Sequence, residues 1–227
     1  MTADSWRGVP WPGGLQRGAL GILGGTFDPI HIAHLAVAEE ACETLRLEGV
    51  LFIPAGLPPH KLDHTITPGE DRLAMIQLAI VGNPAFAASR MELDRSGPSY
   101  TVDTLAALRD ERLAAGKTAD LVLILSAEAF ADFASWREPQ RVLELATLAV
   151  APRDGFPDST PASVGRDFPG LEHRVVLLDG PRLRVSASEL RARAAAGRSL
   201  RYLVPDAVAA HIEDHALYRD PRRTPRP

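Results

Sequence analysis

Residues 24–34 read GGTFDPIHIAH and directly follow a short apolar run, Ala19–Leu23. An apolar run that leads through two glycines into a helical pattern is typical of the first strand and helix of an α/β domain. The glycines let the backbone turn tightly and come close to a ligand, and the N-terminus of the helix offers unpaired N–H groups to an anion. Neither G-x-G-x-x-G nor G-x-x-x-x-G-K-[ST] is present, so this stretch excludes a dinucleotide fingerprint and a P-loop.

The rest of the chain continues this alternation of short apolar runs and helical periodicity. The runs are nearly continuous, as expected of strands buried on both faces. The predicted strands are Ala19–Leu23, Val50–Ile53, Leu121–Leu125, Leu148–Ala151 and Val175–Leu178. The predicted helices are 32–47, 70–82, 101–115, 138–145, 187–196 and 205–214. The sequence therefore predicts an α/β fold, a doubly wound parallel sheet with a small C-terminal helical portion, and a ligand site beyond the carboxyl ends of its strands.

The composition of the chain excludes several classes of protein. The chain has 227 residues, a net charge of −4 and 45% hydrophobic residues, which fits a globular domain. It contains no apolar run near the ~18 residues of a membrane span, and because residues 1–14 lack an apolar stretch we expect no secretory signal there. One cysteine, Cys42, excludes an internal disulfide framework and favours the cytoplasm, and the acidic balance argues against nucleic acid as the main partner. We expect an irregular arm over 1–18, a domain over 19–218 with a Gly-, Pro- and Asp-rich loop over 153–171, and a disordered basic tail over 219–227.

His31 and His34 are three residues apart, so they share one face at the start of the first helix. They could donate hydrogen bonds to phosphate oxygens, which suits a loop at a helix N-terminus. They could instead bind a metal ion, although a third ligand is not close by in the sequence. They could also be ordinary capping or core residues, and the residues alone leave these three alternatives open.

Two further segments carry candidate substrate-binding groups, one after the predicted strand Val50–Ile53 and one that joins a strand-like piece to a helix. The segment PPHK, residues 58–61, forms a stiff loop that ends in Lys61, one of only two lysines in the chain. The segment GPSYTVDTL, residues 97–105, begins a helix at Tyr100 and Thr101. Ser99 or Thr101 could cap that helix, which needs no ligand, or free N–H groups near Tyr100 and Thr101 could hold a substrate anion.

A third segment, residues 126–136, follows the central apolar run. Its aromatic residues Phe130, Phe133 and Trp136 are spaced by three and predict one helical stripe. Such a stripe usually packs in the core, but an aromatic ring at a helix end could also stack on a heteroaromatic ligand.

A fourth segment, VSASELR, covers residues 185–191 late in the chain. Ser186 with Glu189 three residues later predicts a capping box. The hydroxyls of Ser186 and Ser188, together with the guanidinium of Arg191, could instead hold phosphate oxygens.

Taken together, these segments resemble the bacterial nicotinate-nucleotide adenylyltransferases, a branch of the HxGH-type nucleotidylyltransferase superfamily. Five motifs agree in order between about Gly18 and Tyr218: G-G-T-F-D-P-x-H-x-x-H, P-P-H-K, G-P-S-Y-T-x-D-T-L, F-x-x-W and the late serine-rich motif that ends at Arg191. The resemblance implies a Rossmann-like nucleotidylyltransferase domain over 19–218. It also implies adenylyl transfer from ATP, with Mg²⁺, to nicotinate mononucleotide in NAD biosynthesis, and it is compatible with a homo-oligomer.

The resemblance also implies roles for individual residues. The implied catalytic residues are His31, His34 and Arg191. The implied ATP-binding residues are Gly24, Gly25, Thr26, Phe27, His31, His34, Ser126, Glu128, Ser186, Ser188 and Arg191. The implied substrate-binding residues are Lys61, Tyr100, Thr101 and Trp136. Trp136 would stack on the pyridine ring and amides near Tyr100 and Thr101 would receive its carboxylate, whereas Mg²⁺ would bridge phosphate oxygens without a protein metal cage.

Three of the motifs depart from the family pattern. Ala33 stands where glycine is usual, Ser126-Ala127-Glu128 replaces Gly-x-Asp, and Ala187 removes a hydroxyl from the late motif. These departures keep a second class of function open, a catalytically silent nucleotide-binding protein. Adenylyltransferases that act on nicotinamide mononucleotide or phosphopantetheine are the nearest alternatives, and a zinc hydrolase that uses His31 and His34 is the most remote.

Overall fold

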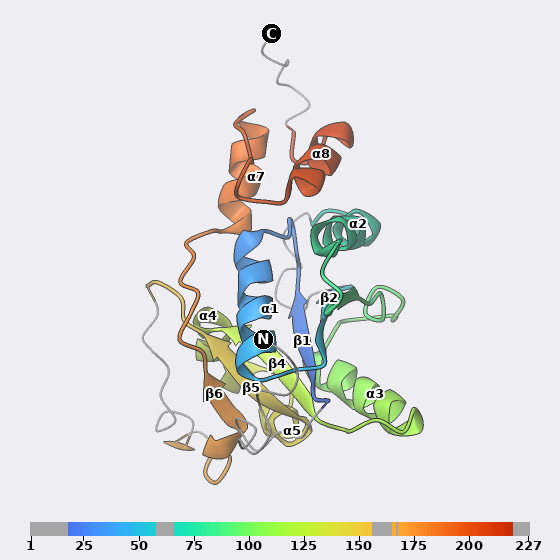
Figure 1. The fold of residues 1–227 in the computed structure, drawn as a ribbon, viewed down its shortest axis with the longest axis vertical. Helices are drawn as coiled ribbons and strands as arrows, with labels where there is room; N and C mark the ends of the chain where they lie inside the picture. The colour runs from blue at the N-terminus through green and yellow to red at the C-terminus, as the bar shows by residue number, and fades with distance from the viewer. Residues whose placement is uncertain (1–17, 58–65, 156–164, 167, 220–227) are drawn as a thin grey trace.

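The computed structural model describes residues 18–57, 66–155, 165–166 and 168–219 (Figure 1). Lys61 and its loop lie outside these residues, as do nearly all of the predicted N-terminal arm and C-terminal tail and much of the predicted loop over 153–171. Within the described part of the chain, no helix has both the length and the apolar character needed to cross a membrane.

The core of the fold is a six-stranded sheet in which all neighbouring strands pair in parallel. The strand order is β3-β2-β1-β4-β5-β6. The strands are β1 (Leu20–Gly25), β2 (Gly49–Pro54), β3 (Phe86–Ala88), β4 (Leu121–Ser126), β5 (Ala146–Ala151) and β6 (Val175–Leu177). This confirms the predicted doubly wound parallel sheet and adds one edge strand, β3, that the apolar runs did not predict.

Helices cover both faces of this sheet, because alternate residues of each buried strand point to opposite sides. The helices are α1 (Ile32–Thr44), α2 (Gly69–Ile80), α3 (Thr101–Ala114), α4 (Ala127–Ala131), α5 (Pro139–Leu145), α7 (Ala187–Ala195) and α8 (Asp206–Asp214). Leu23 and Phe52 belong to the apolar cluster formed with α1, α2, α7 and α8, whereas Ile22 and Ile53 belong to the cluster formed with α3 and α5. The two clusters are the two halves of the core.

The strand order reverses between β1 and β4, where the chain first winds to one side and then to the other. In sheets of this kind, ligands bind outside the carboxyl ends of the strands at that reversal. Helices α7 and α8 lie together at one end of the molecule, next to the start of α1 (Figure 1). The N–H of Ile32, the first residue of α1, donates to the carbonyl of Leu203 between them at 3.1 Å. The C-terminal helices therefore border the predicted ligand edge.

The segment predicted as one helical stripe is shorter than expected. Helix α4 ends at Ala131, a 3₁₀ turn, η2 (Phe133–Ser135), follows it, and Trp136 has extended backbone. The aromatic side chains still form a row, with 6.1 Å between the ring centroids of Phe130 and Phe133 and 5.5 Å between those of Phe133 and Trp136. Only Phe133, the middle ring, is fully buried, and the rings of Phe130 and Trp136 on either side of it are half-buried.

Candidate active site

The loop between β1 and α1 begins at the reversal of strand order, and Phe27 makes its unusual turn. Gly24 and Gly25 are the last residues of β1 and have no positive φ, so the prediction that they supply the tight turn was wrong. Phe27 has a φ of 50°, which costs roughly 1 kcal/mol outside glycine. Its buried ring lies 5.0 Å from the ring of His34. A Cβ at Gly24 would meet no atom within 4 Å, so the loop keeps open space beside its backbone.

The imidazoles of His31 and His34 stack at the start of α1, with 3.7 Å between their centroids. Nδ1 of His34 accepts a hydrogen bond from the backbone N–H of His31 at 3.2 Å. Burial, together with the charge of Arg153, lowers the pKa of His31 to about 4. Burial, with the charges of His31 and Arg153, also holds the pKa of His34 well below its usual range. Both imidazoles are therefore neutral at pH 7, and each can act as an N–H donor.

Arg153 brings a positive charge to this pair from the carboxyl end of β5. Its Nε lies 2.9 Å from Oε2 of Glu128 on α4, so the two neighbouring strand ends are linked. Ser126, at the end of β4, caps α4, because its Oγ accepts a hydrogen bond from the N–H of Ala129 at 3.2 Å. Arg153 is not among the residues predicted from the sequence, although it lies just after a predicted strand, which is the position that drew attention to other candidates.

Asp28 joins the β1–α1 loop to the C-terminal part of the chain. Tyr218 donates to its Oδ1 at 2.6 Å, and the N–H of Thr67 donates to its Oδ2 at 3.3 Å. Nη1 of Arg191 on α7 donates to the backbone carbonyl of Asp28 at 2.7 Å, while Nη2 donates to Oγ of Ser188 at 3.2 Å. Residues 185–191 thus contact residues 24–34 at the loop that carries Asp28. These two motifs are more than 150 residues apart in the sequence.

Ser186 occupies the N-cap position of α7, but its side chain makes no capping hydrogen bond. The predicted capping box with Glu189 is therefore wrong, although the position of the helix start is right. Because the first N–H groups of a helix have no acceptor within that helix, the start of α7 presents hydrogen-bond donors beside the exposed hydroxyl of Ser188.

A buried guanidinium supports the same loop from α2. Arg72 is 3% exposed and donates to the backbone carbonyls of Thr26, Ala55 and Thr67, each at 2.8 Å. These bonds link the segments that follow β1 and β2 to the start of α2. Arg72 is not among the predicted site residues, because an arginine within a helical pattern gives no local sign of burial.

The start of α3 is a second part of the candidate site. Tyr100 is the N-cap residue of α3 and makes no side-chain capping bond. The predicted capping by Ser99 or Thr101 was wrong. The hydroxyl of Ser99 accepts a hydrogen bond from the N–H of Gly56 at 3.0 Å instead, and the N–H of Ser99 donates to the carbonyl of Leu57 at 3.0 Å. The first N–H groups of α3 are left for another acceptor.

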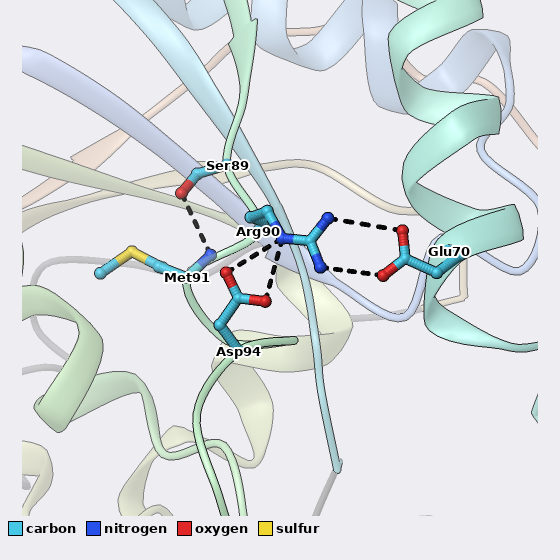
Figure 2. Close-up of polar contacts among 5 residues, drawn as sticks. All are labelled: Glu70, Ser89, Arg90, Met91 and Asp94. Carbon is cyan, nitrogen blue, oxygen red and sulfur yellow. Dashed lines mark hydrogen bonds and ion pairs between the residues drawn. The ribbon is translucent and has the colours of Figure 1, made fainter.

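Charged side chains fix the first part of the loop that leads to α3. Figure 2 shows Arg90 between the carboxylates of Glu70 on α2 and Asp94. The nitrogen–oxygen distance of each ion pair is 2.9 Å. Deeper in the loop, the carboxyl of Glu92 accepts a hydrogen bond from Thr104 at 2.7 Å, and burial raises the pKa of Glu92. These contacts hold the approach to the start of α3.

Trp136 and Tyr100 pack against the same apolar cluster. The guanidinium of Arg137, next to Trp136 in the chain, lies 4.5 Å from the ring centroid of Tyr100. Such a contact between a cation and an aromatic face is attractive, and it links the end of η2 to the start of α3. The structure therefore brings two of the predicted substrate-binding positions, Tyr100 and Trp136, to neighbouring elements.

The arrangement offers neutral imidazole donors, guanidinium groups and helix N-termini around one edge of a sheet. These groups are suited to hold a polyanion and to stabilise charge that develops on its oxygens. In the described ranges, no trio of metal-ligating side chains includes His31 or His34. The geometry thus favours the phosphate alternative for this pair over the metal alternative.

Known proteins similar to this chain agree with the fold described above. A family model described as cytidylyltransferase-like matches residues 22–193. A "Probable nicotinate-nucleotide adenylyltransferase" of Roseiflexus sp. (strain RS-1) is 51% identical over 205 residues, which cover 90% of this chain and all of that protein. The protein of the same name from Thermus thermophilus is 44% identical and covers 88% of this chain and 99% of its own.

A solved structure supports the fold. Plasmodium falciparum nicotinic acid mononucleotide adenylyltransferase complexed with NaAD matches with a TM-score of 0.73 and 19% identity, over 89% of this chain and 98% of its own.

Proposed function

The chain belongs to the nicotinate-nucleotide adenylyltransferases of the cytidylyltransferase-like family, and from that premise we propose how its own residues carry the reaction. The reaction is ATP plus nicotinate mononucleotide giving nicotinate adenine dinucleotide and pyrophosphate, a step of NAD biosynthesis. The observation that carries our assignment of residues is the meeting of the β1–α1 loop and α7 at Asp28, with His31 and His34 beside it.

No side chain has to remove a proton in this reaction. A phosphate oxygen of the mononucleotide attacks the α-phosphorus of ATP, and the bond from that phosphorus to the bridging oxygen breaks. The electron pair of the broken bond leaves with pyrophosphate. Catalysis then consists of alignment and of charge stabilisation on the α-oxygens and the leaving group.

We assign the phosphates of ATP to the β1–α1 loop and α7. His31 and His34 are neutral in the free protein, so each donates one hydrogen bond to a phosphate oxygen, with His34 assigned to the α-phosphate. Arg191 and the hydroxyls of Ser186 and Ser188 take the β- and γ-phosphates. Arg191 already donates to the loop carbonyl of Asp28, which supports this grouping.

The residues around this loop fit Mg²⁺ only as an ion that ATP carries. Mg²⁺ prefers oxygen ligands and keeps several waters, whereas the side chains that face the loop are mostly imidazoles and guanidiniums. The buried carboxylate of Asp28 has its two oxygens engaged by Tyr218 and Thr67. We therefore assign no protein ligand to Mg²⁺, which would neutralise charge on the phosphate oxygens when bound.

We assign the pyridine ring of the mononucleotide to the start of α3 and to Trp136. The N–H groups at Tyr100 and Thr101 face the ring carboxylate, and the ring of Trp136 stacks on the pyridine. The charge of Arg137, 4.5 Å from the ring of Tyr100, further favours an anion there. An amide ring gains less from these groups, so we expect the acid to be preferred. Lys61 is assigned to a substrate phosphate.

Pyrophosphate release by the purified chain tests the reaction. The assay contains ATP and Mg²⁺, with nicotinate mononucleotide, nicotinamide mononucleotide or phosphopantetheine in parallel. Release with the acid well above the amide would support both the reaction and the ring-carboxylate assignment. Equal rates would keep the reaction and refute the carboxylate assignment. Binding of ATP without release with any acceptor would favour a silent binder and turn attention to Ala33, Ser126 and Ala187.

A substitution tests the assignment of His34. His34→Ala removes the donor assigned to the α-phosphate, and we expect kcat to fall by ~10²-fold or more. His173→Ala is the matched control, because His173 is exposed on η3 (Glu172–Arg174). An unchanged kcat in His34→Ala, with a folded protein by circular dichroism, would refute the role.

A further inference from the structure

Three potential metal ligands meet where α8 packs on α2. One ligand atom each of Asp71, His211 and His215 lies within 4.8 Å of the other two. Of all side chains that the structure describes, these form the one such group of three. His211 and His215 are four residues apart at the end of α8, so they share one face, and Asp71 comes from the first turn of α2.

The distance between Asp71 and His211 is better suited to two ligands of one ion than to a hydrogen bond. Oδ1 of Asp71 lies 3.4 Å from Nε2 of His211, and that buried nitrogen has no hydrogen-bond partner. Zinc binds nitrogen and oxygen at ~2.0–2.2 Å in tetrahedral geometry, which places two ligand atoms roughly 3.4 Å apart. A buried nitrogen without a partner is costly, and an ion bound to it would remove that cost.

His215 is also arranged as a ligand. Its Nδ1 lies 3.0 Å from the carbonyl oxygen of His211. In the tautomer that donates from Nδ1, Nε2 carries the free lone pair, and this is the usual arrangement of a metal-bound histidine. The imidazole of His215 stacks on that of His211 with centroids 4.0 Å apart and is exposed, so its side chain can turn to close the remaining distance.

We propose that Asp71, His211 and His215 bind a divalent ion of the zinc class, with water as the fourth ligand, and that this ion fastens α8 to α2. Two imidazoles and one carboxylate suit Zn²⁺ or Co²⁺ rather than Mg²⁺. An ion at this position would also stabilise the candidate active site, because residues close to its ligands hold the β1–α1 loop. Arg72, next to Asp71, holds the β1–α1 loop, and Tyr218, three residues after His215, donates to Asp28 of the same loop.

Metal binding to the full chain tests this site without any activity assay. The protein is freed of metal with a chelator and dialysed, and Co²⁺ is titrated while its visible absorption is recorded, with no nucleotide present. We expect one Co²⁺ per chain and the absorption of a tetrahedral ion. Zn²⁺ at ~100 times its Kd should raise Tm by about 5–10 °C, and Mg²⁺ should not.

Two variants locate the ion. His215→Ala changes an exposed residue and should leave the fold intact, and Asp71→Asn keeps the shape of the side chain. Each should weaken Co²⁺ binding at least ~10-fold and, at the same Zn²⁺ concentration, cut the rise in Tm to about half or less, whereas His173→Ala should change neither. Absence of stoichiometric binding by the unmodified chain would overturn the proposal, leaving a plain contact between His211 and Asp71. Equal binding by the two variants would overturn it too, by placing the ion elsewhere.

Discussion

Acidification should destabilise this protein through His31, which is 5% exposed and has a pKa lowered from 6.5 to about 4. Below pH 6.5 the unfolded chain binds a proton at this residue, while the folded chain stays neutral there until about pH 4. The unfolded state therefore gains protons, and the free energy of unfolding falls as the pH falls through this window. For these two pKa values, the loss between pH 7 and pH 5 is about 2 kcal/mol. His34, whose pKa is also lowered, adds to the loss in the same direction.

Urea denaturation at pH 7 and pH 5 measures this loss. His31→Gln keeps a polar side chain but cannot titrate, so the difference between the two pH values should shrink by about 2 kcal/mol relative to the unmodified chain. His173→Gln, at an exposed position on η3, should keep the full pH dependence. If His31→Gln showed the same pH dependence as the unmodified chain, burial of a neutral His31 would not be the cause and the reasoning would fail.

Three further substitutions probe the loop. Arg72→Lys should lower the free energy of unfolding by about 2–4 kcal/mol in urea denaturation, since lysine cannot reproduce three bonds to buried carbonyls; a loss below 0.5 kcal/mol would refute this. Tyr218→Phe should cost about 1–3 kcal/mol by the same method, because it removes the donor to a buried carboxylate at Asp28; an unchanged stability would count against that bond. Ala33→Gly should lower KM for ATP if the extra methyl group crowds the nucleotide, and an unchanged KM would show that it does not.

The sequence predicted most strands because a strand that is buried on both faces consists of consecutive apolar residues, which can be recognised locally. All five residues of the run Leu121–Leu125 in β4 are buried, and five apolar residues in a row are visible without any structure. The edge strand β3 is too short to be recognised in this way. It has three residues, is only partly buried, and exists because Phe86, Ala87 and Ala88 pair with β2. Pairing with a partner 36 residues earlier in the chain cannot be deduced from a window of three residues.

The residues of the candidate site also fall into two groups, those that could be predicted from the local sequence and those that could not. His31, His34, Ser186, Ser188 and Arg191 could be proposed because each lies in a short motif. The groups that hold those motifs could not, because their roles depend on contacts between distant segments. Arg72 bonds a carbonyl 46 residues before it in the chain, and Tyr218 donates to Asp28, 190 residues away.

The predictions of helix capping were wrong for a related physical reason. Serine at a helix start usually bonds to the helix itself, and the sequence offered Ser99 and Ser186 for that role. In the structure, Ser99 bonds to Gly56 on a neighbouring segment and Ser186 makes no capping bond. Uncapped helix starts keep their N–H groups for other acceptors, so the failure of the local rule at these two helices coincides with the positions assigned to substrate anions.

The conformation of Phe27 ties the C-terminal helices to the candidate site. A phenylalanine at a φ of 50° costs roughly 1 kcal/mol and persists only where surrounding contacts determine the backbone. Those contacts come from Arg72 on one side, and from Arg191 and Tyr218, which bond to the neighbouring Asp28, on the other. Each such bond contributes about as much as the strain costs. Loosening α7 or α8 would therefore release the β1–α1 loop, and with it the geometry of His31 and His34, before it disturbed the sheet.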